Sequence, residues 1–132
     1  MGRGSGLPRG SEEKGMKQNL IDLLATLSYP VYLQGSLAGK PYPESFFTYW
    51  NGDTEDRSHY DNKAIDYVWT FSIFFYSTSA TLVNTVTKSA IDLLKSNGWI
   101  VDGKGYDVPT DVITHTGRAF DALFIELESE DD

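Results

Sequence analysis

The feature that most constrains the fold of this chain is an alternation of side-chain character between Ile65 and Tyr76. The odd-numbered positions are all large and apolar, whereas the even-numbered ones are largely polar until Phe74. Side chains of a strand point alternately to two faces, so this pattern predicts a strand with one face buried and one face at least partly in water. The odd-numbered side chains expected in the core are Ile65, Tyr67, Trp69, Phe71, Ile73 and Phe75.

Two segments carry the spacing of amphipathic helices. Within residues 16–28, leucines recur every three or four positions. A second apolar stripe runs from Leu82 to Leu94, with Lys95 in the expected last turn. The residues expected to bound the helices are Pro30 after the first, and Ser77 or Ser79 before and Asn97-Gly98 after the second.

The remaining apolar runs predict further strands, because they are short and lie between glycine, proline or polar residues. Together with the helices they give the order α-β-β-β-α-β-β, which belongs to the α+β class. We expect an antiparallel or mixed sheet of four to five strands, with both helices packed on one face. The additional strands are expected within residues 31–37, 45–51, 99–109 and 112–128, the last one bent or bulged at Gly117.

The length of 132 residues fits a single domain, which we expect to occupy residues 16–127. Residues 1–15 are glycine-rich and polar, and their "LPRGS" resembles a protease-site linker of an expression vector. We therefore interpret residues 1–15 as vector-derived, or as a flexible arm, and place them outside the fold. Residues 128–132 form an acidic tail that is expected to fray.

The absence of cysteine excludes several kinds of functional site, and the formal net charge of −8 disfavours another. Without cysteine the chain has no disulfide, no thiolate nucleophile and no cysteine-based zinc site. A strongly acidic domain is repelled by nucleic-acid backbones, which disfavours a stacking platform for single strands. No apolar run is long enough to span a membrane, and the N-terminus lacks the apolar centre of a secretory signal, so we expect no membrane partner.

The segment "THTGRAFD", residues 114–121, holds the residue types of a Ser-His-Asp site. Thr114, His115, Arg118 and Asp121 lie close together in the sequence. No nucleophile elbow and no oxyanion-hole motif accompanies them. We therefore expect a strand end whose polar groups are hydrogen-bonded locally.

The polar loop after residue 51 offers carboxylates and a histidine, but not in the spacing of a metal site. Calcium loops need a fixed alternation of ligands and a glycine at the turn, and this loop fits no such template. The "GKG" of residues 103–105 lacks the spacing of a phosphate loop and predicts a turn. We therefore expect no enzyme activity, no cofactor and no metal. The loop side chains considered as ligands are Asp53, Glu55, Asp56, His59 and Asp61.

Some large aromatic side chains are left without a place in the core. If the helices cover the odd-numbered face of residues 65–76, Phe74 and Tyr76 point to the other face. Residues 45–51 carry aromatic side chains at both odd and even positions, so they have the same difficulty. An uncovered group of this kind marks a partner surface, unless loops such as 35–44 fold over it. The predicted interface comprises Phe47, Tyr49, Trp50, Asp53, Glu55, Asp56, Tyr60, Phe74 and Tyr76.

Five motifs follow one another along the chain. In order, they are "YPESFFTYWN" (42–51), an acidic loop ending in "YDN" (60–62), "WTFSIFFYS" (69–77), "LLKSNGW" (93–99) and "THTGRAFDALF" (114–124). This series is similar to small tail proteins of siphophages, and of prophages in Gram-positive bacteria, of the tail-terminator or tail-completion type. The resemblance covers nearly all of residues 16–127, and its motifs are structural rather than catalytic.

The resemblance implies an α+β subunit of a ring, expected to be a hexamer, that terminates the tail tube and joins it to the head. Such a subunit would belong to the virion tail, be assembled in the bacterial cytoplasm, and contact tail-tube and head-completion proteins. DNA would pass through the ring without specific binding. A head-to-tail ring would also bury the left-over aromatic side chains against a neighbouring copy. The resemblance carries over no catalytic residue.

Three other functions stay open on the sequence alone. A monomeric adaptor would bind a protein partner through the aromatic patch and would never form a ring. A binder of single-stranded nucleic acid is disfavoured by charge, and would reveal itself by salt-sensitive binding of an oligonucleotide. A small hydrolase is the least favoured, because no catalytic motif supports it.

Overall fold

The computed structural model describes residues 9–52, 55–56 and 65–127, with only the backbone described for 9–14, 55–56, 65–67 and 127. Two helices and seven strands are formed by these residues, so the chain belongs to the α+β class, as its pattern predicts. The elements are α1 (Arg9–Ala25), β1 (Val31–Leu33), β2 (Ser45–Asn51), β3 (Glu55–Asp56), β4 (Ile65–Ser77), α2 (Ala80–Ser96), β5 (Ile100–Val101), β6 (Tyr106–Val108) and β7 (Thr116–Leu127).

A single mixed sheet runs through the molecule in the order β1-β2-β4-β7-β5. β1 pairs with β2 in parallel, and the other pairs are antiparallel. β3 lies along the same edge of β4 as β2, and β6 shares the outer edge of β7 with β5. The seven segments therefore fill five positions across the sheet, in agreement with the expected four to five strands.

β4 and β7 form the long central pair of the sheet. They pair along nearly their whole length, with one register irregularity between Ile65 and Tyr67. No register shift occurs at Gly117, which lies opposite Tyr76, so the prediction of a bulge at this glycine is wrong. A glycine is needed here because a side chain would not fit beside Tyr76. A Cβ at this position would lie 2.7 Å from the Tyr76 ring.

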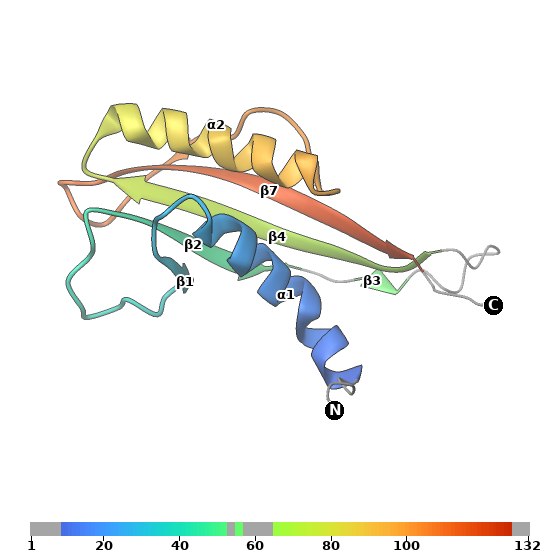
Figure 1. Ribbon diagram of the computed structural model, residues 1–132. Helices are drawn as coiled ribbons and strands as arrows, with labels where there is room; N and C mark the ends of the chain where they lie inside the picture. Colours follow the sequence, from blue (N-terminus) through green and yellow to red (C-terminus); the bar gives the residue numbers. More distant parts are fainter. Residues whose placement is uncertain (1–8, 53–54, 57–64, 128–132) are drawn as a thin grey trace.

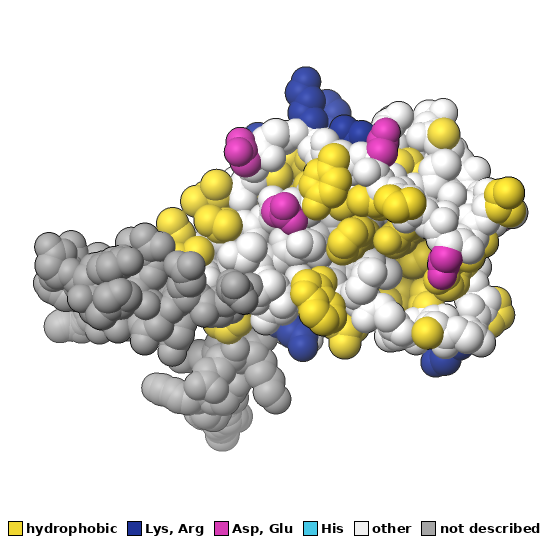
Figure 2. All heavy atoms as spheres, turned by 180° about the vertical axis from the view of Figure 1, so that it is seen from behind, with side chains coloured by type: hydrophobic (Ala, Val, Ile, Leu, Met, Phe, Trp, Pro, Cys, Tyr) yellow, Lys and Arg dark blue, Asp and Glu magenta, His cyan; other side chains and the backbone are white. Residues whose placement is uncertain are grey.

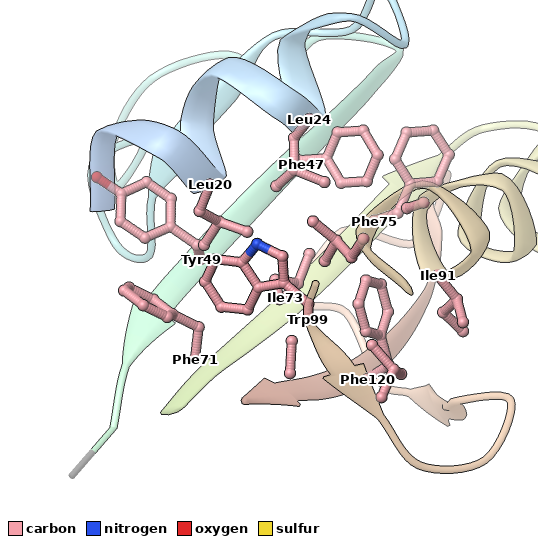
Figure 3. Packing of buried hydrophobic residues seen from close by; sticks show 14 of the residues in the cluster. Leu20, Leu24, Phe47, Tyr49, Phe71, Ile73, Phe75, Ile91, Trp99 and Phe120 are labelled. Atoms are coloured by element: carbon pink, nitrogen blue, oxygen red, sulfur yellow. The ribbon is translucent and has the colours of Figure 1, made fainter. Parts of the chain in front are cut away.

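Both helices lie on one face of the sheet, and the core fills the space between the two layers (Figure 1). The β4 side chains of Phe71, Ile73 and Phe75 are fully buried in this core, as the alternation predicts. Burial of their apolar surface stabilises the fold by about 25 cal/mol per Å² removed from water. Figure 3 shows the core residues that surround them, among them Leu20, Leu24, Phe47, Tyr49, Ile91, Trp99 and Phe120.

Local sequence sets both ends of α2. Ser79 caps the N-terminus, because its Oγ accepts a hydrogen bond of 3.2 Å from the backbone N–H of Leu82. Ser77, the other expected cap, instead accepts a hydrogen bond from the backbone N–H of Ser79. At the other end Lys95 lies in the last turn, where a cation interacts favourably with the helix dipole. Gly98 follows with a φ of 91°, the left-handed conformation that stops the helix.

Two elements differ from the expectations. α1 begins at Arg9, so residues 9–15, expected outside the fold, are helical. Pro8 directly precedes this start in the sequence, and proline is favoured in the first turn of a helix. β3 lies within the expected polar loop, where its two residues pair with β4. A strand this short has no readable period, so only the partner strand reveals it.

Candidate functional site

The sheet face opposite the helices carries no helix among the described residues, and we call it the open face. Residues directly opposite each other in an antiparallel pair share a face. Phe74 therefore lies on the open face together with its partner Ala119, and so does Ile100 with its partner Leu123. Figure 2 shows apolar side chains gathered across the middle of this face, with acidic side chains scattered among them.

Three apolar side chains of the open face are about half exposed. The exposed fraction is 54% for Trp50 on β2, 50% for Ile100 on β5 and 48% for Tyr106 on β6. Because they come from both sides of the central pair, the exposed surface extends across the sheet. Exposed apolar patches mark contacts with other proteins more often than scattered single residues do, and here the hydrogen-bonded polar pair Ser72 and Asp121 lies beside Trp50 within the patch. The half-buried Val68, Phe74, Tyr76, Leu123 and Ile125 complete it.

Loops cover one end of the open face. Phe46 points away from the helices and is nevertheless only 2% exposed. The rings of Tyr42 and His115 lie edge-on to its ring, at centroid distances of 5.4 and 6.1 Å. His115 Nε2 lies 2.9 Å from the carbonyl oxygen of Pro43, which fixes the two loops to each other. The alternative that loop 35–44 folds over the aromatic side chains is therefore correct for this end only.

A pocket of about 520 Å³ lies between these loops and the sheet. The ring of Tyr76 lines it and lies parallel to the ring of Phe74, with the centroids 6.2 Å apart. Thr48 Oγ1 donates a hydrogen bond of 2.7 Å to Gln34 Oε1 within this lining. Burial raises the pKa of the Tyr76 hydroxyl above 10.0, so the phenol is neutral at neutral pH. Further lining residues are Leu37, Tyr42, Phe46 and Asp111.

The structure divides the predicted interface residues into three groups. Trp50, Phe74 and Tyr76 lie on the open face, as expected. Phe47 and Tyr49 do not, because they lie opposite Phe75 and Ile73 and are buried under the helices. Their place in an exposed interface is therefore wrong. The remaining residues are Glu55 and Asp56, of which only the backbone in β3 is described, and Asp53 and Tyr60, which lie outside the described residues.

Sequence reasoning missed two contributors to the open face, Ile100 and Tyr106. Ile100 stands between Trp99 and Val101, which the structure buries on the helix side. All three residues are apolar, so the sequence shows no alternation that would place Ile100 on the opposite face. Tyr106 belongs to a three-residue strand behind a turn, and no period is readable in so short a segment.

The part of the chain that the structure describes assembles no catalytic or metal-binding cluster. His115 Nδ1 lies 3.0 Å from the Oγ1 of its neighbour Thr114. Asp121 instead accepts a hydrogen bond of 2.8 Å from Ser72 on the open face. The prediction of local hydrogen bonds is therefore correct for Thr114 and His115 Nδ1 only, because His115 Nε2 reaches Pro43 and Asp121 bonds to another strand. Within these residues no group of three or more His, Asp or Glu side chains could hold a metal ion, and the proposed loop ligands Asp53, His59 and Asp61 lie outside them.

Comparison of the sequence with protein-family models and with curated proteins finds no match. In the described ranges no helix is long and apolar enough to cross a membrane. The function must therefore be inferred from the geometry of the site. A sheet with its helices on one face and half-exposed aromatic side chains on the other is suited to contact with another protein.

Proposed function

We propose that this chain is a structural, non-enzymatic subunit that assembles with other proteins through the open face of its sheet. The observation that supports this proposal is the half exposure of Trp50, Ile100 and Tyr106 on a face without a helix over it. Tryptophan and tyrosine are enriched in the centres of protein interfaces, where they contribute much of the binding energy. Burial of this face against a partner would remove its apolar surface from water.

In the form that the sequence resemblance implies, the subunit belongs to a ring that terminates a phage tail tube and joins it to the head. A ring of identical subunits needs a heterologous contact, in which two different patches of neighbouring copies meet. The open face would supply one of these patches. Tail-tube and head-completion proteins would be the other neighbours in the virion tail. The net charge of −8 suits a ring that lets DNA pass without holding it.

A monomeric adaptor is the second candidate, and the pocket of about 520 Å³ at the covered end of the open face favours it. Its aromatic and polar lining offers a place for one side chain of a partner. In that function the open face would receive a single different protein, and the chain would not associate with itself.

Sedimentation velocity over a wide concentration range tests the proposal. The wild-type chain should form one discrete oligomer as its concentration rises. Trp50→Ser and Tyr106→Ser should shift this equilibrium towards the monomer without lowering the midpoint of thermal unfolding. Ile113→Ser is the matched control, because Ile113 is 98% exposed in the loop before β7 and outside the sheet.

Oligomers that persist unchanged in both open-face variants would contradict the use of this face. A wild-type chain that is monomeric at every concentration would be mixed with purified tail tubes. Capping of the tubes would then support the ring subunit, and failure to bind them would favour the adaptor.

A further inference from the structure

A second surface feature lies on the helix side of the sheet, away from the open face. It is a cleft of about 400 Å³ between the outer side of α2 and the turn at residues 103–105, and we call it the basic cleft. Of the six Lys and Arg side chains that the structure describes, four line this cleft. The four are Lys88, Lys95, Lys104 and Arg118, and the two elsewhere are Lys17 and Lys40.

Arg118 fixes the outer wall of the basic cleft. Its Nη1 donates a hydrogen bond of 2.7 Å to Asp107 Oδ1, and its side chain is only 23% exposed. Its Nη2 donates to the carbonyl oxygens of Lys104 and Gly105, at 3.3 and 3.0 Å. Gly103 and Gly105 both have positive φ, which lets the turn close against β7. The backbone of Lys104 is therefore held at the cleft by hydrogen bonds.

The stripe of α2 that faces the turn supplies the inner wall. Lys88 and Lys95 lie seven residues apart, on the same side of the helix. Lys88 forms an ion pair of 3.2 Å with Asp92, whereas Lys95 and Lys104 have no ion pair within the described part of the chain. Four cations thus face two carboxylates, those of Asp92 and Asp107, in a chain whose net charge is −8. This local excess of positive charge attracts anionic groups.

We propose that the basic cleft is a carboxylate-binding site that receives the acidic segment 128–132, "ESEDD", of a second copy of this chain. The segment carries four carboxylate side chains in five residues, which complements the excess positive charge of the cleft. Figure 1 shows β7 running past the C-terminal end of α2. Arg118, which lines the cleft, lies near the start of β7, whereas the acidic segment follows its end at Leu127 in the sequence, so a neighbouring copy is the better source. A cleft of about 400 Å³ fits a few side chains, whereas the net charge of −8 repels a long nucleic acid.

This inference rests on the proposed function only for the presence of a second copy. It adds a second contact between neighbouring copies, which joins the basic cleft of one copy to the acidic segment of the next. Because the cleft lies on the helix side, it can be occupied while the open face makes its own contact.

Fluorescence anisotropy with a labelled peptide of sequence ELESEDD tests the cleft in the full chain. The peptide should bind saturably, and its affinity should fall as the salt concentration rises, because the contact is electrostatic. Lys95→Glu/Lys104→Glu should weaken binding about tenfold or more, since two attractive pairs become repulsive. Lys17→Glu/Lys40→Glu is the matched control, because it changes the net charge equally but lies outside the cleft. Thermal unfolding checks that both variants are folded.

Three results would overturn the proposal. The first is an equal loss of affinity in the two double variants, which would reduce the effect to net charge. The second is equal binding of the neutral peptide QLQSQNN. The third is displacement of the acidic peptide by inorganic phosphate at matched ionic strength, which would assign the cleft to phosphate groups.

Peptide binding that survives Trp50→Ser while the oligomer is lost would separate this site from the open face. Peptide binding by a chain that stays monomeric, both alone and with tail tubes, would show a carboxylate-binding cleft but would overturn the ring and the second copy as the source of the segment.

Discussion

The ring of Tyr76 lies against the Cα of Gly117 on the neighbouring strand, so closely that no other residue fits there without movement. A Cβ on Gly117 would lie 2.7 Å from both Cδ1 and Cε1 of Tyr76 and 3.0 Å from Cγ2 of Val108. Gly117→Ala should therefore lower the free energy of unfolding by about 1–3 kcal/mol, the usual cost of overpacking. Urea unfolding followed by circular dichroism measures this loss.

The matched variant combines Gly117→Ala with Tyr76→Ala, which removes the ring that the new methyl group meets. If the clash is the cause, the double variant should be more stable than the sum of the two single losses implies. Strict additivity of the two losses would show that the backbone of Gly117, and not its closeness to Tyr76, is what matters.

Truncation of two neighbouring aromatic residues on β2 should lower the free energy of unfolding by very different amounts. Tyr49→Ala should lower the free energy of unfolding by about 3–5 kcal/mol, because Tyr49 is 6% exposed in the core. Trp50→Ala should cost about 1 kcal/mol or less, because Trp50 is 54% exposed on the open face. Thermal and urea unfolding of the two variants provide the comparison. Similar losses of stability in both variants would contradict the strand register, which places Tyr49 in the core and Trp50 on the open face.

Removal of one buried hydroxyl should stabilise the protein. Thr87 lies on the buried side of α2 and is only 1% exposed. Its Oγ1 has no hydrogen-bond partner among the described residues. Thr87→Val keeps the shape and removes the unpaired polar atom, so we expect a gain of about 1 kcal/mol. The control is Thr85→Val on the exposed side of the same helix, where Oγ1 donates to the carbonyl oxygen of Thr81. A loss of stability in Thr87→Val would show that the hydroxyl is paired in solution.

Stability should fall at alkaline pH through Tyr76. Burial raises the pKa of its hydroxyl above 10.0. This effect is larger than the opposite effect of Gln34, which lowers the pKa. The folded state therefore holds this proton more tightly than the unfolded chain does. The resulting contribution is fully present below the unfolded pKa and is lost as pH rises through the higher folded pKa.

Urea unfolding between about pH 9 and about pH 11 measures this contribution, and Tyr76→Phe is the control because it cannot ionise. The alkaline loss of stability should be smaller in Tyr76→Phe than in the wild type. Identical losses would assign the effect to other tyrosines, such as Tyr106, whose pKa is also raised by burial.

The sequence predicted those parts of the fold in which one face of an element is uniform. The alternation in β4 placed Phe71, Ile73 and Phe75 in the core, and all three are fully buried. The cap at Ser79 and the stop at Gly98 also follow from local chemistry that involves only a few neighbouring residues. Where local patterns are unambiguous, they agree with the tertiary structure.

The candidate site was harder to predict, because β2 carries large rings on both of its faces. The sequence separates Phe47 and Tyr49 from Phe46 and Trp50, but it does not tell which pair faces the helices. The register with β4 decides this, since Phe47 lies opposite the buried Phe75. Such a register depends on pairing between distant segments, so neither segment alone predicts it.

β7, one strand of the central pair, comes later in the sequence than every strand that it pairs with. β7 pairs with β4 on one side and with β5 and β6 on the other, so these three strands each lack a neighbour until residues 116–127 have emerged. During translation the apolar β4 would therefore present an unpaired edge, the kind of edge that recruits other strands and aggregates. A product that stops before β7 could not close this sheet, because the facing edges of β4, β5 and β6 would stay unpaired.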